Sequence, residues 1–596
     1  MFETPRLLIT TEDESTWRFD RPVIFLGEWC RSYDRRHIWQ NMDAIVAEPY
    51  GLGKAKIDAD IAKAKRIEDE IFPLLCRSLN GFHEINKSER FWRIIIGHWF
   101  HDFVQVMLNR TNSLQKCLVE NNIAGISSPR AGGGNLTISQ FDSYWHLALE
   151  DPTWNGEVYL RILEILSSSI PVIENAPVGA QVNINDDYFK GSYPKGIKLR
   201  KALFHFLKKI SPLLSRKTDA FIVSSYMHPK EEIKLQIGLG QFPSFWKTPE
   251  VKIKTRPNLQ LRKQLTNELL NNLDEGLLKI VKTLLFEVFP VAYLEGFSEI
   301  EFLASRQPWP NKPKFIFTSN AFFSNDVYKF WFANKVESGV KYFVGQHGNN
   351  YFTDRRLLNS VEEITADKFL TWGCTDESGK YIPAFVFQNQ PNNPPKVKQS
   401  GGLLLITVGP AIRMATFDVS IQAHENLSMN KTFIENLARK PRELTTLRLT
   451  KGTLHHPFSD KSRWQDFDSK LRIDEGVRPI DELISENRLV VHGYDSTGIL
   501  RTLSQNIPTV AFWMNGFDHL TDEVICDYEI LLEAGIIHLN PVTAAQLVNK
   551  VWDEVDDWWM EKKVQNARKL FCAKYARVSQ QPSRELKQIL LSQIEK

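Results

Sequence analysis

Paired cysteines are missing from this 596-residue sequence, which has only six cysteines, at positions 30, 76, 117, 374, 526 and 572. No CxxC pair occurs, and the spacing fits neither a zinc site nor a disulfide framework. Free thiols are typical of proteins in a reducing compartment. The cysteines therefore indicate a protein without a structural metal of the zinc-finger type.

Long hydrophobic runs are also missing. No uncharged apolar stretch approaches the roughly 20 residues that a membrane-spanning helix needs. The first twenty residues, "MFETPRLLITTEDESTWRFD", contain only a short apolar run, too short for the core of a signal peptide. We therefore predict a cytoplasmic protein.

An excess of either charge is absent as well. The 74 Lys and Arg residues nearly balance the 71 Asp and Glu residues, which leaves a net charge of +3 and gives no argument for a nucleic-acid partner. One segment departs from this balance. Residues 190–217 contain many Lys and Arg residues, no acidic residue and an apolar side. Such a segment predicts peripheral binding to an anionic inner-membrane surface; the alternative is a core helix with a solvated basic face.

Short β-rich runs alternate with helical patterns along the chain, which is typical of α/β units around parallel sheets. In the first part of the chain, the predicted strands are residues 7–11, 22–26, 221–225, 314–318, 341–345 and 369–372. In the second part, they are residues 402–408, 446–450, 488–492, 508–512 and 536–539. The pattern predicts an α/β fold with two doubly wound, Rossmann-type domains.

A linker separates the two series of strands. The stretch "QNQPNNPPKVKQSGG", residues 388–402, is rich in Pro, Asn and Gly and predicts irregular structure. We predict an N-terminal domain over residues 1–387, with a helical insertion at about 50–220, and a C-terminal domain over residues 403–575. Residues 551–577 predict one long closing helix that crosses back onto the first domain, and residues 576–596 predict a tail.

Polar residues follow three predicted strands of the C-terminal domain. Ligands of open α/β sheets bind at the carboxyl ends of strands, and a helix start suits an anion. The predicted phosphate-binding residues are Arg413, Lys451, His456, Pro457, Asp495, Ser496, Thr497 and Gly498. Each residue alone has a simpler explanation, since Ser or Thr before a helix is commonly a cap and His-Pro is commonly a turn. Their coincidence at three strand ends favours a nucleotide phosphate.

Other polar residues follow predicted strands of the N-terminal domain. Glu28, Asp326 and His347 are candidates for an acid, base or nucleophile that faces the interdomain cleft, beside Asn320, Gln346 and Gly348. Two alternatives stay open, because Asp326 could stabilise a helix start and Glu28 could pair with a nearby arginine.

Motifs along the whole chain resemble a family of transferases of about this length from bacterial surface-carbohydrate gene clusters. The matching stretches are "LITT" (8–11), "FLGEWC" (25–30), "FWRIIIGHW" (91–99), "FTSNAFFSNDVYKFWFANKVESG" (317–339), "GQHGNNY" (345–351), "FLTWG" (369–373) and "STGILRTLSQNIPTVAFW" (496–513). His98 departs from the pattern, since the resemblance implies proline there. The resemblance implies synthesis of O-antigen, capsule or a similar glycan.

The C-terminal domain is also similar to GT-B transferases that use CMP-activated ulosonic acids. Their His-Pro and Ser/Thr pairs, which hold the CMP phosphate, correspond to His456-Pro457 and Ser496-Thr497. CDP-glycerol polyol-phosphate transferases carry similar motifs. The resemblance therefore implies a GT-B-like fold and a cytidine nucleotide donor.

The function expected from these observations is a metal-independent glycosyltransferase without a cofactor. It would transfer a sugar from a nucleotide sugar to a lipid-linked glycan acceptor. The alternatives are a CDP-polyol phosphotransferase, a non-catalytic scaffold of a glycan-assembly complex and a sugar-nucleotide epimerase.

Overall fold

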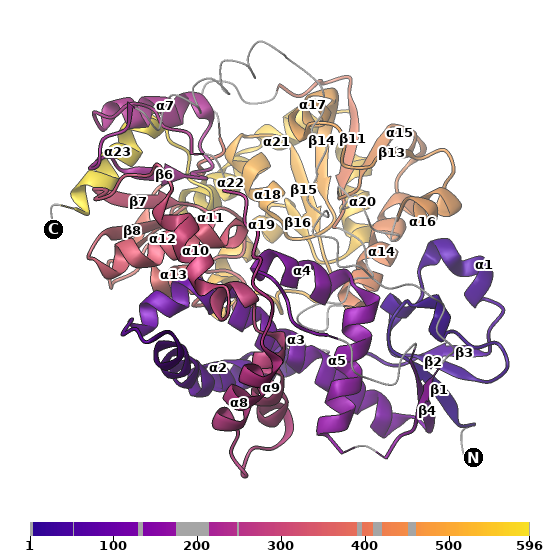
Figure 1. The fold of residues 1–596 in the computed structure, drawn as a ribbon. Helices are drawn as coiled ribbons and strands as arrows, with labels where there is room; N and C mark the ends of the chain where they lie inside the picture. The colour runs from indigo at the N-terminus through magenta and orange to yellow at the C-terminus, as the bar shows by residue number, and fades with distance from the viewer. Residues whose placement is uncertain are drawn as a thin grey trace.

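The computed structural model describes residues 4–51, 53–128, 135–167, 169–174, 214–246, 249–389, 396–408, 420–450 and 460–594. Three parallel sheets organise these residues (Figure 1). The first sheet has the order β3-β2-β1-β4-β5, the second β10-β9-β8-β7-β6 and the third β13-β12-β11-β14-β15-β16. The predicted α/β class with parallel sheets is confirmed.

The strands are short and mostly buried. Those of the first sheet are β1 (Arg6–Ile9), β2 (Val23–Phe25), β3 (Ala44–Val46), β4 (Ile123–Ser128) and β5 (Val172–Glu174). Those of the second sheet are β6 (Phe221–Val223), β7 (Phe315–Thr318), β8 (Lys341–Gly345), β9 (Lys368–Thr371) and β10 (Tyr381–Pro383). Those of the third sheet are β11 (Gly402–Ile406), β12 (Thr445–Arg448), β13 (Arg472–Asp474), β14 (Asn487–His492), β15 (Thr509–Phe512) and β16 (Ile537–His538).

Helices cover the sheets. Those around the first two sheets are α1 (Arg36–Trp39), α2 (Lys54–His83), α3 (Glu89–Glu120), α4 (Phe141–Glu150), α5 (Pro152–Ile165), α7 (Pro229–Gly238), α8 (Leu259–Leu269), α9 (Gly276–Val288), α10 (Phe297–Ser305), α11 (Ala321–Ser324), α12 (Asp326–Glu337) and α13 (Val361–Thr365). Those around the third sheet are α14 (Ser420–Glu435), α15 (Arg439–Glu443), α16 (Asp460–Phe467), α17 (Ile480–Glu486), α18 (Thr497–Ser504), α19 (Ile525–Glu533), α20 (Pro541–Val551), α21 (Val555–Met560) and α22 (Lys562–Tyr575). No described helix is both long enough and apolar enough to cross a bilayer.

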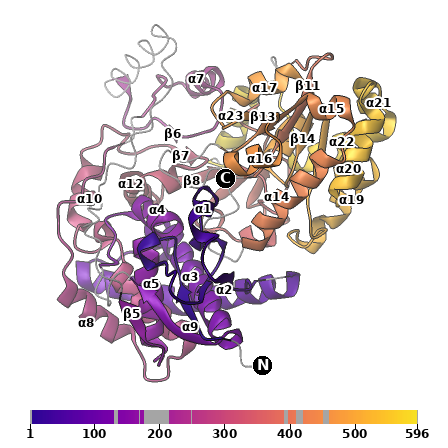
Figure 2. The same ribbon diagram turned by 90° about the vertical axis from the view of Figure 1, so that its right-hand side faces the viewer.

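The N-terminal part of the chain differs from the prediction of one sheet with a helical insertion at about 50–220. The predicted strands divide between two sheets, because β1 and β2 pair with β3 and β4 rather than with β6 or β7. The segment predicted as the insertion contains α2 and α3, as expected, but also β4 and β5. These two strands complete the first sheet. Figure 2 shows this sheet at the bottom, below the third sheet.

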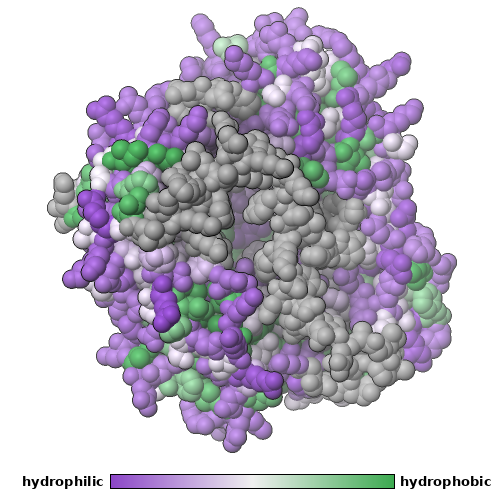
Figure 3. All heavy atoms as spheres, turned by 45° about the horizontal axis from the view of Figure 1, so that its top comes forward, coloured by the Kyte–Doolittle hydropathy of each residue, from purple (hydrophilic) through white to green (hydrophobic). Residues whose placement is uncertain are grey.

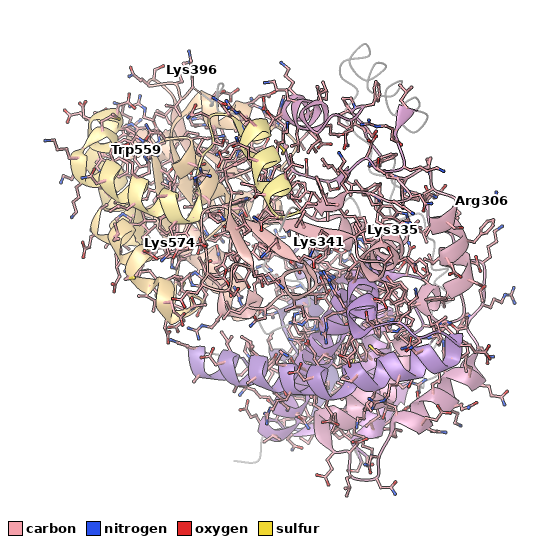
Figure 4. The ribbon with its side chains drawn as sticks, turned by 90° about the vertical axis from the view of Figure 1, so that its left-hand side faces the viewer. Arg306, Lys335, Lys341, Lys396, Trp559 and Lys574 are labelled. Carbon is pink, nitrogen blue, oxygen red and sulfur yellow. The ribbon has the colours of Figure 1, made fainter. Side chains whose placement is uncertain are left out.

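Helix α3 joins the first two sheets through one hydrophobic core. It is buried along most of its length and packs against α2, α9, α12 and α13. Its Trp92 and Trp99 are fully buried. Core side chains from β1 and β2 belong to the same cluster as side chains from β6 to β9. The long amphipathic α2 then crosses the molecule to the third sheet's side (Figure 4), where Lys54 Nζ lies 2.5 Å from Asp522 Oδ1.

The C-terminal segment confirms the predicted return to the N-terminal part but corrects its form. The expected long helix is interrupted at Glu561, whose extended backbone (φ −52°, ψ 139°) separates α21 from α22. Residues 576–596, predicted as a tail, contain helix α23 (Pro582–Ser592). Leu586 and Leu590 of α23 pack in one cluster with Phe315 and Phe317 of β7. Figure 1 shows α23 beside α7, on the second sheet.

The third sheet has its own core and a reversal of strand order. Its cluster includes Leu403, Leu489 and Val510 from three neighbouring strands. Strand numbers fall from β13 to β11 and then rise from β14 to β16, so the order reverses between β11 and β14. The described residues on the face drawn in Figure 3 are mainly hydrophilic. The second and third sheets are thus both parallel, and α23 returns from the third-sheet side to pack on the second sheet.

Candidate active site

The stretch Asp495–Gly498 lies at the carboxyl edge of the third sheet. Strand β14 ends at His492, and α18 begins at Thr497. In open α/β sheets, the ligand crevice forms where the strand order reverses, outside the carboxyl ends of the strands. Because the order reverses between β11 and β14, this stretch stands at the predicted position for a ligand.

The loop after β8 meets this stretch from the second sheet. Asn349 donates its backbone N–H to Thr497 Oγ1 at 2.9 Å and its side-chain amide to Asp495 Oδ1 at 2.8 Å. The next residue back, Gly348, is so close that a Cβ atom there would lie 3.4 Å from Thr497 Oγ1. The structure thus brings the predicted residues around His347 to the predicted residues 495–498. The carboxyl ends of two parallel sheets meet at this junction.

The carboxylate of Asp495 contacts polar groups from three segments. Besides Asn349, His519 Nε2 and Tyr528 Oη each lie 3.1 Å from Asp495 Oδ2. Such a carboxylate is held in one orientation by its hydrogen bonds. Asp495 therefore fixes the geometry of the junction.

Ser496 does not cap its helix. It occupies the N-cap position of α18 without a side-chain capping bond, and its Oγ lies 3.4 Å from His492 Nδ1. Burial lowers the pKa of His492 to about 3, so this imidazole is neutral at pH 7. A Cβ atom on Gly498 would lie 2.6 Å from His492 Cε1. Packing on the buried imidazole therefore requires glycine at position 498.

His347 lies in an aromatic environment. Its Nδ1 is 3.2 Å from Tyr351 Oη, and its ring centre is about 6 Å from the rings of Tyr226, Phe322 and Phe323. Burial lowers the pKa of His347, because it disfavours the charged imidazolium. The imidazole is therefore neutral at pH 7, as a group that accepts a proton must be.

Gln346 and Asn320 support this loop. The Gln346 side chain accepts from the backbone N–H of Trp372 at 2.8 Å and donates to the Gly348 carbonyl at 3.0 Å. It ties the loop to the end of β9. Asn320 donates to Tyr226 Oη at 2.7 Å, beside His347. Both residues position their neighbours.

The prediction that Asp326 faces the cleft is wrong in position. Asp326 is buried; its Oδ1 lies 2.7 Å from Lys329 Nζ and accepts from Tyr293 Oη, while its Oδ2 accepts from Phe141 N at 3.2 Å. The alternative role at the helix start belongs in part to Asn325, which caps α12. A carboxylate enclosed by an ammonium, a phenol and a backbone N–H stabilises the interior and cannot reach a substrate.

Glu28 has the arginine partner that the alternative interpretation named. It begins a short 3-10 helix after β2, at the carboxyl edge of the first sheet. Its carboxylate forms a two-pronged pair with Arg31, at 2.7 and 3.0 Å. The catalytic role of Glu28 stays a prediction.

The remaining predicted residues, Arg413, Lys451, His456 and Pro457, lie outside the described residues, as does most of the basic segment 190–217. Within the described ranges, no three His, Cys, Asp or Glu side chains gather into a metal site.

The sequence itself decides the family. Residues 6–590 match the sequence profile described as "LIC12162 family transferase". The chain belongs to this family. The resemblance to a transferase family of about this length is therefore confirmed, and the LIC12162 profile spans all three sheets.

Other comparisons with this LIC12162 family member are weaker. No curated protein sequence matches it significantly. A UDP-N-acetylglucosamine 2-epimerase from Listeria monocytogenes aligns with a TM-score of 0.34 and 10% identity, over 61% of this chain and 100% of that one. The spinosyn rhamnosyltransferase SpnG aligns at 0.30 and 11%, over 63% and 100%. The wall teichoic acid polymerase TagF aligns at 0.30 and 10%, over 67% and 99%. Scores this low assign no reaction to the chain.

Sequence reasoning missed several residues of the junction in this family member. Asn349 stands inside the quoted motif "GQHGNNY", so the motif itself was the available signal. His519 and Tyr528 reach Asp495 from elsewhere in the third-sheet domain. Away from the junction, Glu362 contacts His98, 264 positions earlier in the chain. Contacts between such distant positions leave no local pattern in one sequence.

Proposed function

We propose that this LIC12162 family transferase is a glycosyltransferase of bacterial surface-polysaccharide synthesis. It would move a sugar, preferably a CMP-activated ulosonic acid, from a nucleotide donor to a lipid-linked glycan at the inner membrane. The observation that carries the proposal is the junction at which Asn349 of the second sheet holds Thr497 and Asp495 of the third. A transferase needs two substrates side by side, and two carboxyl edges that meet supply two adjacent ligand positions.

The donor phosphate would lie at the start of α18. Thr497 Oγ1 already accepts from Asn349, and a hydroxyl has one hydrogen of its own to donate. The first backbone N–H groups of a helix have no partner within the helix and favour an anion. Arg413, Lys451 and His456 follow neighbouring strands in the sequence and would add positive charge. These donors would stabilise the leaving nucleotide without requiring a metal.

His347 would accept the proton. In this step, an acceptor hydroxyl oxygen bonds to the anomeric carbon, and the bond from that carbon to the donor phosphate oxygen breaks. The nucleotide leaves with the bonding electron pair, and the hydroxyl proton passes to His347. Its lowered pKa supports this role, because a neutral imidazole is a competent base at pH 7.

Isothermal titration with CMP, CDP, UDP, GDP and ADP tests the proposal. We expect selective binding of a cytidine nucleotide, weakened at least tenfold by Thr497→Val, which removes the hydroxyl but keeps the shape. Ser504→Ala is the matched control, because Ser504 stands at the other end of the same helix. Selective UDP or GDP binding would rule out the ulosonic-acid donor.

Turnover assays separate the alternatives. Release of CMP that depends on a glycan acceptor supports the glycosyltransferase, whereas turnover of CDP-glycerol would identify a polyol phosphotransferase. The absence of binding by every nucleotide would refute the proposal in favour of a scaffold.

A further inference from the structure

A chain of four side chains runs from the buried core to His347. Glu362 in α13 is 4% exposed, and its two oxygens contact different partners. Oε2 lies 3.1 Å from His98 Nε2, and Oε1 accepts the hydroxyl of Tyr351. Tyr351 Oη in turn lies 3.2 Å from His347 Nδ1. The order of the side chains in this hydrogen-bonded series is therefore His98, Glu362, Tyr351, His347.

Three separate elements contribute to this chain, and apolar rings enclose it. His98 comes from α3, Glu362 from α13, and the other two from the loop after β8. Phe322 stacks on His98 at 4.9 Å with an angle of 11° between the rings, and its edge faces His347 at 6.1 Å. Hydrogen bonds in such surroundings are stronger than in water, and a missing partner costs more. The arrangement thus restricts the His347 ring to one orientation.

Counting protons assigns the direction of each hydrogen bond. Tyr351 has one hydroxyl proton, and the ionised carboxylate of Glu362 takes it as a hydrogen-bond acceptor. The Tyr351 oxygen can then only accept from His347. A neutral imidazole has a single N–H, and the contact with Tyr351 takes it when the proton is on Nδ1. The Ser319 backbone is the competing acceptor for this proton.

We infer that Glu362, acting through Tyr351, is a positioning residue for His347: it fixes the imidazole with its proton on Nδ1 and leaves Nε2 as the nitrogen that accepts a proton. The role of His347 as a proton acceptor in this inference rests on the proposed function. The geometry of the ring does not depend on that function.

The charges around the chain agree with this assignment. Burial raises the pKa of Glu362, but the hydrogen bond and charge interaction with His98 and the hydrogen bond from Tyr351 outweigh it and lower the pKa to about 2, so the carboxylate is ionised at pH 7. For His347, burial lowers the pKa, while Glu362 and the Ser319 backbone favour the protonated form and offset part of that effect. The other ionisable groups that face the cluster include His101 and Asp102 of α3, Glu363 of α13, Tyr226, and Tyr342 of β8.

Nitrogen-15 NMR of histidine-labelled full-length protein tests the inference directly. The His347 signals are assigned by their loss in His347→Gln. In the wild type at pH 7.5, we expect a neutral ring with at least tenfold more Nδ1–H than Nε2–H tautomer. Tyr351→Phe keeps the aromatic ring and removes the hydroxyl, so the tautomer ratio should fall at least fivefold. Glu362→Gln should also lower the ratio.

Glu68→Gln is the matched control. It removes a carboxylate from another histidine of α3, His101, whose Nδ1 lies 2.8 Å from Glu68 Oε1. It should leave the His347 signals unchanged. An unchanged tautomer ratio in Tyr351→Phe, with the protein folded by circular dichroism, would overturn the inference.

Kinetics separate this inference from the proposed function. Loss of positioning should lower kcat at least tenfold, leave KM within twofold and shift the pH profile of kcat. If the wild type transfers no sugar while the tautomer still responds to Tyr351→Phe, the function fails and the positioning stands. If sugar transfer occurs and neither the tautomer nor the pH profile responds, the positioning fails and the function stands.

Discussion

Replacing His492 with glutamine should make the stability of the protein less sensitive to acid. The imidazole is fully buried, and burial lowers its pKa to about 3, against an ordinary value of 6.5. Below pH 6.5 the unfolded chain therefore binds a proton that the folded chain does not. The stability present above pH 6.5 is lost progressively as the pH falls toward 3. At pH 5.0, which is 1.5 pH units below 6.5, the free energy of unfolding should be lower by about 2 kcal/mol, at about 1.36 kcal/mol per pH unit.

Thermal unfolding at pH 7.5 and pH 5.0 gives the fall in Tm on acidification for each protein. Comparing this fall between wild type and variant cancels any effect of the substitution that does not depend on pH. For a unit of about 150–250 residues, about 2 kcal/mol corresponds to roughly 4–8 °C in Tm. The wild type should therefore lose about 4–8 °C more than His492→Gln on acidification. His37→Gln, at an exposed imidazole, is the control and should behave as the wild type. If wild type and His492→Gln show the same loss, the reasoning about a neutral, buried His492 is refuted.

Two further substitutions test packing and charge. Gly498→Ala should lower the free energy of unfolding in urea by about 1–3 kcal/mol, because its Cβ atom would overlap a buried imidazole. The control is Gly81→Ala in α2, whose Cβ atom meets no atom within 4 Å and which should be neutral or stabilising in the same assay. Asp326→Asn should cost about 3–5 kcal/mol, because it leaves the fully buried Lys329 ammonium without its carboxylate. Asp69→Asn, in an exposed pair, should change the urea midpoint little, and equal midpoints for the two aspartate variants would contradict the structural role of Asp326.

The sequence predicted the third sheet better than the first. Five of its strands follow from apolar runs between turn signals, and only the three-residue β13 was missed. In the first sheet, β4 has the sequence "IAGISS", whose glycine and serines give no apolar run. Its strand character comes from pairing with β1 on one side and β5 on the other. Such pairing depends on tertiary context, and for the same reason the division into two N-terminal sheets could not be read from local patterns.

The candidate site was predicted by position more than by role. Residues that follow strands were expected at the sheet edge, and the stretch 495–498 and His347 do lie there. Roles depend on partners that one sequence does not reveal. Lys329 and Tyr293 hold Asp326 in the interior. His98 contacts Glu362 through its ring nitrogen, a contact that the proline implied by the resemblance could not form.

The start of α18 is better explained by a ligand than by capping. A serine at the N-cap position normally satisfies a free N–H of the first helical turn, yet Ser496 forms no such bond, and its hydroxyl turns toward His492. Gly498 packs on the same imidazole, and Thr497 is held by Asn349. The first turn is therefore fixed from two sides, while the serine that could cap it is used elsewhere. A rigid helix start with N–H groups that its own N-cap side chain does not satisfy suits an anion, which is consistent with the phosphate position proposed above.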